Sequence, residues 1–186
     1  MSRSAAYGAA APRTIAFCAG AQGTWQVIGQ SAWIGDDLPR ADWLDIGAPA
    51  PDAHWTLMGF TSNLRYTTRD ERATLDARSA PIGRPEARMA ALLPIRKTPE
   101  WWAMAQDERR AVYARSAHTP IGLGYLPGIA RRLHHCRDLG EPFDFLTWFE
   151  FMPEAEPAFD ELLARLRLTE EWRFVEREVD IRLIRP

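Results

Sequence analysis

The chain has 186 residues, of which 46% are hydrophobic and 26% charged, the composition of an ordinary globular domain with a sizeable core. Its net charge of −2 excludes the broad positive field that nucleic-acid-binding proteins present. No apolar run approaches the ~20 residues of a membrane-spanning helix. We therefore expect one domain with no nucleic-acid partner and no membrane insertion.

The N-terminal stretch MSRSAAYGAAAPR consists mainly of small residues. Tyr7, Gly8 and Pro12 interrupt its alanines, so it lacks the apolar core of a signal peptide. We expect a flexible leader over residues 1–13 and a cytoplasmic protein. Two cysteines, Cys18 and Cys136, provide no disulfide framework and are expected to be buried small hydrophobic residues.

The first half of the remaining chain is rich in β-forming residues. Residues 14–34 contain two such runs separated by glycines, a pattern that predicts strand, turn and strand. Three prolines predict a loop over 39–53, and alternation predicts a further strand over 55–66. A polar helix over 70–78 and a turn at 81–83 follow.

The second half alternates helices and strands. A threonine cap followed by proline, at residues 98–99, predicts a helix that ends near His118. A hairpin over 129–151, an amphipathic helix from Pro157 and a last strand over 173–184 follow. This order is typical of an α+β fold with ferredoxin-like modules.

The stretch SAHTPIGLGYLPGIARRLHHC, residues 116–136, contains three of the four histidines. Its glycines have the spacing G-x-G-x-x-x-G, which misses the dinucleotide-binding spacing by one residue and follows a helix instead of a strand. His134 and His135 are neighbours on a predicted strand, so their side chains face opposite sides and do not form a metal chelate. We expect both to be half-buried.

His118 ends the predicted helix, which begins with Trp101 and Trp102. A lone histidine is usually a packing residue, and the axial ligand of a haem is the main exception, because haem needs one protein ligand and apolar walls. Arg131 lies on the next strand, where an inward guanidinium needs an anion and an exposed one does not. From the residues alone, both roles of each residue stay open.

Long blocks of the chain resemble the chlorite dismutase family, in its short-chain branch. The resemblance extends from about Trp25 to the C-terminus and is densest in TSNLRY (61–66), LLPIRKTPEWW (92–102), QDERRAVYARSAH (106–118) and residues 125–151 and 166–183. It implies a haem b enzyme that converts chlorite to chloride and dioxygen. It also implies a dimeric α/β-barrel of two ferredoxin-like halves, a trimmed one over about 14–95 and a second over about 96–186.

The resemblance implies roles for individual residues around the iron. His118 corresponds to the proximal ligand, and Arg131 to the catalytic arginine on the distal side. Glu171 corresponds best to the glutamate that accepts a hydrogen bond from the proximal histidine, with Glu170 as the alternative. Lys97 corresponds to the lysine beside that glutamate, which would hold it ionised.

Other residues are implied to surround the cofactor. Trp101 and Trp102 correspond to tryptophans beside the haem, and Asn63 and Tyr66 to contacts of its propionates. The sequence departs from the short-chain pattern at one point, because it has no glutamine near the distal arginine. Ser79 is the residue expected at that position.

Two alternatives to chlorite turnover remain. One is a haem-binding or sensing module of the same superfamily, with a small anion as its ligand. The other is a coproheme decarboxylase, a class whose members lack the distal arginine, so that Arg131 argues against it. We expect chlorite as the small anionic substrate and a homodimer as the assembly.

Overall fold

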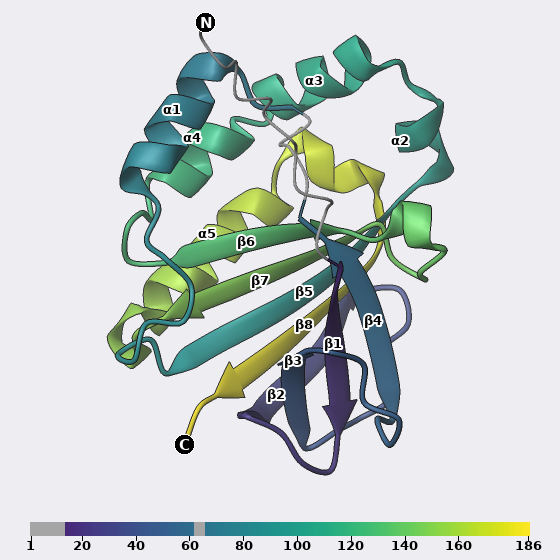
Figure 1. The fold of residues 1–186 in the computed structure, drawn as a ribbon. Coiled ribbons are helices and arrows are strands. Elements are labelled where there is room, and N and C mark those ends of the chain that lie inside the picture. The colour runs from purple at the N-terminus through teal and green to yellow at the C-terminus, as the bar shows by residue number, and fades with distance from the viewer. Residues whose placement is uncertain (1–13, 62–65) are drawn as a thin grey trace, which may run out of the picture.

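The computed structural model describes residues 14–61 and 66–186. The predicted leader and the predicted propionate contact Asn63 lie outside these residues. Within them, eight antiparallel strands close into one barrel in the order β1-β3-β2-β8-β5-β7-β6-β4, and the fold mixes helix and strand as predicted (Figure 1).

The helices lie on the side of β5–β8, whereas β1–β4 form the rest of the barrel (Figure 1). The strands are β1 (Thr14–Gly20), β2 (Trp25–Ile34), β3 (Trp43–Gly47), β4 (Trp55–Phe60), β5 (Met89–Lys97), β6 (Ala130–His135), β7 (Phe145–Phe151) and β8 (Val175–Ile184). The α-helices are α1 (Arg69–Arg78), α2 (Pro99–Ala103), α3 (Gln106–Arg115), α4 (His118–Leu123) and α5 (Glu156–Arg167), and the 3-10 helices are η1 (Arg137–Leu139), η2 (Pro153–Ala155) and η3 (Glu170–Phe174). No helix among the described residues combines the length and apolar character that crossing a membrane requires.

Both halves of the barrel have the same strand order. The first half runs β4-β1-β3-β2 and the second β8-β5-β7-β6, so each places its fourth, first, third and second strand side by side. Among the described residues, helices that connect two strands of the same half occur only in the second half, and α1 connects β4 to β5. The strand β5, which contains residue 95, pairs with β7 and β8 along its length.

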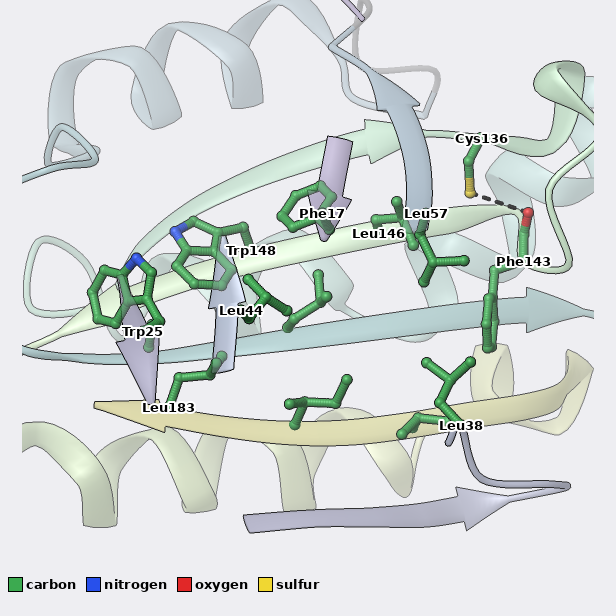
Figure 2. Packing of buried hydrophobic residues seen from close by; sticks show 14 residues of the cluster. Phe17, Trp25, Leu38, Leu44, Leu57, Cys136, Phe143, Leu146, Trp148 and Leu183 are labelled. Carbon is green, nitrogen blue, oxygen red and sulfur yellow. Dashed lines mark hydrogen bonds between the residues drawn. The ribbon is translucent and has the colours of Figure 1, made fainter. Parts of the chain in front are cut away.

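The barrel interior is filled by apolar side chains from both halves. Phe17, Trp25, Leu44 and Trp148 are among its buried members, and the rings of Trp25 and Trp148 meet edge to face with centroids 5.3 Å apart (Figure 2). Cys136 lies in the same cluster and donates its thiol to the carbonyl of Phe143 (Figure 2). As predicted, both cysteines are buried and unpaired.

A second apolar cluster lies outside the barrel, between β5, β7 and the buried face of α5. Phe159, Leu162, Leu163 and Leu166 of α5 are all buried in it, as their helical spacing predicts. The structure therefore has two layers in this half, a sheet and a helical cover. The site described below lies between these layers.

Two predicted elements differ from the structure. The predicted loop over 39–53 contains β3, which pairs with β1 and β2. The predicted single helix over 98–118 is wrong, because the chain forms α2 and α3 and then starts α4 at His118. Ala117, between α3 and α4, has φ 50° in the left-handed region, which turns the chain at this point.

Candidate active site

A cavity of about 440 Å³ lies between the outer face of the second-half sheet and its helices. Its volume is in the range of small-molecule and cofactor sites. Alternate residues of β5, β6 and β7 form one wall, and α1, α3, α4, α5 and η3 contribute the others. The lining is mainly apolar and includes Leu93, Ile95, Ile129, Leu133, Phe149, Leu162, Leu163, Leu166 and Trp172.

His118 and Glu171 meet at one wall of this cavity. Nδ1 of His118 lies 2.7 Å from Oε2 of Glu171. On its other oxygen, Oε1, Glu171 accepts a hydrogen bond of 2.9 Å from Nζ of Lys97. Both Glu171 and Lys97 are buried, with 6% and 5% of their surface exposed, so the three groups form a hydrogen-bonded row inside the protein.

The electrostatics of this row favour an ionised carboxylate. Burial alone would raise the pKa of Glu171, but the charges of His118 and Lys97 and their hydrogen bonds hold that pKa well below its usual range. An ionised Glu171 accepts a hydrogen bond from Nδ1–H of His118, and this leaves Nε2 as the ring nitrogen that can bind a metal.

The ring of His118 is held by aromatic neighbours. Tyr113 stacks on it with centroids 4.5 Å apart, and Trp172 lies parallel to it at 6.4 Å. A ring held on its faces and at Nδ1 has one fixed direction for Nε2. Among the cavity-lining residues, His118 is thus preorganised as a single ligand.

Glu170, the alternative partner, faces another residue. Both of its carboxylate oxygens accept hydrogen bonds from Arg115, at 2.9 and 2.8 Å. The two adjacent glutamates therefore point to different partners on α3 and α4. Only Glu171 contacts His118 in the structure.

Arg131 lies on β6 and lines the same cavity as His118. Its backbone is opposite Phe149 of β7, and its side chain is half-buried. Among the described residues, no carboxylate or other hydrogen-bonding group pairs with its guanidinium. Arg131 is close enough to Tyr113 for its charge to lower the pKa of that phenol, although burial dominates and raises it. A cavity-facing guanidinium without a counter-ion is suited to bind a small anion.

The structure brings only part of the predicted cofactor shell to the cavity. Trp101 and Tyr66 line it and meet edge to face, with centroids 5.8 Å apart. Ser79, at the C-terminal end of α1, also lines it. Trp102 does not. Its indole Nε1 instead donates to Asp144, at 3.1 Å.

Three further residues of the cavity were not predicted from the sequence as site residues: Tyr113, Trp172 and His135. His135 is 4% and His134 3% exposed, so the expectation that they are half-buried is wrong. They do face opposite sides, since His134 meets Phe17 of the barrel core. The sequence could have indicated His135 as a cavity residue. It follows Arg131 by four residues on one strand, and residues four apart on a strand lie on the same face.

Comparison with known proteins assigns the chain to a family. The family model described as chlorite dismutase matches residues 48–184. The crystal structure of dimeric chlorite dismutases from Nitrobacter winogradskyi is similar with a TM-score of 0.88 and 50% sequence identity, over 92% of this chain and 99% of that one.

More distant structures are of the chlorite dismutase from Candidatus Nitrospira defluvii. Its complex with imidazole has a TM-score of 0.58 and 26% identity, over 77% of this chain. A variant of that protein has a TM-score of 0.59, also at 26% identity. The chain spans 56% of the length of either structure. Together, the match over residues 48–184 and the 50% identity over most of both chains show that this protein belongs to the chlorite dismutase family.

Proposed function

We propose that the protein is a haem b-dependent chlorite dismutase that converts chlorite into chloride and dioxygen, ClO₂⁻ → Cl⁻ + O₂. The observation that carries this proposal is that one apolar cavity is faced by the His118–Glu171 pair and by the guanidinium of Arg131, which pairs with no described residue. A single histidine ligand and an anion-binding group in an apolar cavity match the requirements of this reaction.

The cavity residues fit a haem. Nε2 of His118 would bind the iron, and the apolar walls, together with Trp101 and Tyr66, would contact the porphyrin. When bound, the haem iron supplies the redox chemistry at the chlorite oxygen atoms. Glu171, kept ionised by Lys97, makes the imidazole of His118 a stronger electron donor.

Arg131 acts on the substrate directly in this proposal. Its guanidinium attracts chlorite into the cavity and holds it by charge-assisted hydrogen bonds. It also retains any hypochlorite formed from chlorite, because an oxyanion that leaves the cavity cannot take part in forming the O–O bond. Leu133 and Phe149, which line the cavity with it, surround the anion with apolar surface of low dielectric constant, which strengthens these contacts.

We also propose that the chain forms a homodimer. Its similarity to structures described as dimeric, over nearly the whole of both chains, supports this assembly. The common strand order of the two barrel halves supports a ferredoxin-like origin of each half, with the first half lacking the helices of the second.

An oxygen electrode tests the enzymatic proposal. Protein loaded with haem b is expected to release dioxygen from chlorite well above the rate of an equal amount of free haem. A normal haem spectrum with anion binding but no dioxygen release would contradict it and indicate a haem-binding module. Loss of two carboxyl groups from added coproheme with peroxide, measured by mass spectrometry, would instead indicate a decarboxylase.

A further inference from the structure

The segment that joins α3 to α4 lies directly against η3. Three pairings connect them. Arg115 donates to both oxygens of Glu170, at 2.9 and 2.8 Å. The amide of Glu171 donates to Oγ of Ser116, at 2.8 Å. Nδ1 of His118 lies 2.7 Å from the Glu171 carboxylate.

The left-handed backbone of Ala117 makes this arrangement possible. Ser116 ends α3 and His118 begins α4, and the turn at Ala117, with φ 50°, lets both side chains reach the same residue of η3. A non-glycine residue with positive φ persists where the surrounding contacts determine it. The turn and the pairings with Glu171 therefore belong to one local structure.

The two pairings at the end of α3 differ in burial. The side chains of Arg115 and Glu170 are 58% and 35% exposed, so solvent screens their ion pair. Ser116 is only 5% exposed. The hydrogen bond that its hydroxyl accepts from the amide of Glu171 is also buried. Removing the hydroxyl would leave a buried N–H group without an acceptor. The Ser116 contact is therefore the one that holds η3 most firmly against α3.

Glu171 is shared between two sides of the site. From β5, Lys97 contacts both its carboxylate, at 2.9 Å, and its backbone carbonyl, at 3.4 Å. From the other side it has His118 at the carboxylate and Ser116 at the amide. We propose that Ser116 is a positioning residue: its hydroxyl anchors the backbone of Glu171, so that the carboxylate keeps its bond to His118 instead of moving wholly to Lys97.

This inference rests on the proposed function only for the role of His118 as iron ligand, so its first test needs no haem. The full chain without cofactor is studied by long-range ¹H–¹⁵N NMR of the histidine rings, at a pH well above the ordinary histidine pKa. A carboxylate at Nδ1 selects the Nδ1–H tautomer of His118. In Ser116→Ala the Nε2–H tautomer is expected to become the major form, whereas Ser116→Thr, which keeps the hydroxyl, should retain the wild-type ratio.

The matched control is Thr169→Val. Thr169 precedes η3 and donates its hydroxyl to the carbonyl of Leu166, at 2.7 Å, so this variant loses a hydrogen bond in the same segment without touching the Glu171 amide. It should leave the tautomer of His118 unchanged. An unchanged ratio in folded Ser116→Ala, or an equal shift in Thr169→Val, would overturn the proposal. Should Ser116→Ala not fold, Ser116→Cys replaces it, since sulfur is a weaker acceptor and should give a partial shift; an unchanged ratio there would also overturn the proposal.

A second measurement uses the haem-loaded protein. Ser116→Ala is expected to lower haem affinity about 10-fold, the usual cost of loosening a partner of a metal-binding histidine, and to raise the iron midpoint potential. If no variant, wild type included, binds haem, the proposed function fails while the tautomer result stands. If wild type binds haem and Ser116→Ala has the same affinity and potential, the positioning role fails alone.

Discussion

His118 and Glu171 are 53 residues apart in the chain, yet Nδ1 of one lies 2.7 Å from Oε2 of the other. The contact joins the start of α4 to η3, two elements on the outside of the barrel. Because Glu171 is also bonded to Lys97 of β5, the pair ties both helical segments to the sheet.

Glu171→Gln tests the importance of the charge in this contact. The amide keeps the size of the side chain but is a weaker acceptor and leaves Lys97 without its counter-ion, so the ring of His118 loses orientation. Haem affinity is expected to fall ~10-fold or more in a spectroscopic titration. Glu170→Gln is the control, since Glu170 pairs with Arg115 on the surface. A larger loss in the control would transfer the role to Glu170.

His118→Ala is expected to remove the normal haem spectrum and chlorite turnover, because it deletes the proposed ligand. His135 lines the same cavity, so residual binding through that histidine must be tested. The double variant His118→Ala with His135→Phe serves this purpose. Residual binding present in the single variant and absent in the double one would identify His135 as a substitute ligand. A native spectrum in His118→Ala would contradict the assignment.

Arg131→Ala is expected to do more than weaken substrate binding. Loss of attraction alone would raise KM and leave kcat nearly unchanged. Loss of retention would also release hypochlorite, which monochlorodimedone traps, and would lower the total dioxygen yield through self-inactivation. Arg131→Lys keeps the charge without the planar fork, so its behaviour should be intermediate. Equal trapping and equal total turnover in wild type and Arg131→Ala would reduce the residue to a structural one.

The sequence predicts those parts of the fold that depend on local pattern. The helical spacing of Phe159 and Leu162 gives α5, and its buried face lies as predicted. The sequence does not predict β3, because a five-residue strand among prolines is defined by its pairing with β1, which is a non-local contact. The sequence does not predict β5 either. Eight of its nine residues are buried, so it lacks the alternation of apolar and polar residues that marks a half-buried strand.

The site divides in the same way. Residue types and family resemblance indicate His118 and Arg131, whose side chains do line one cavity. They do not show which of Trp101 and Trp102 lines the cavity. Neighbouring side chains on a helix point in different directions, and Trp102 is directed away by its hydrogen bond to Asp144, 42 residues further along the chain. To predict which of two neighbouring residues faces the site, one must therefore know how elements distant in the chain are positioned against each other.

Trp33 provides a test of the homodimer. It and Ile28 lie where the pairing of β2 with β8 shifts register, so both are extra residues at bulges, and they are 56% and 51% exposed. The guanidinium of Arg167 lies 4.4 Å from the centre of the Trp33 ring, which orients it. Large exposed apolar side chains next to arginine are typical of interface centres.

Trp33→Glu is therefore expected to weaken the dimer at least ~10-fold in dissociation constant, as loss of a central aromatic residue does. Light scattering after size exclusion, over a range of concentrations, measures this. Leu139→Glu is the control, since Leu139 of η1 is similarly exposed, at 44%. A wild-type monomer at all concentrations, or equal weakening in both variants, would contradict this interface.

His134 makes the stability of the fold depend on pH. Burial, with a smaller contribution from the charge of Arg132, lowers its pKa from 6.5 to about 4, although its bond to the carbonyl of Leu146 opposes the shift. Between these two values the unfolded chain binds a proton at this residue and the folded chain does not. Stability from this residue is therefore complete above pH ~6.5 and decreases as the pH falls towards ~4.

Urea unfolding of wild type and His134→Gln at several pH values isolates this effect, because the other titrating groups are common to both. Gln does not titrate, so it removes the pH-dependent contribution even where it changes the overall stability. Wild type is expected to lose up to ~1.4 kcal/mol per pH unit more than the variant between pH ~6.5 and ~4, and no more than the variant above that range. Parallel stability curves for the two proteins through this interval would mean that His134 is protonated inside the folded barrel, beside Phe17, and that its burial does not disfavour the charged ring.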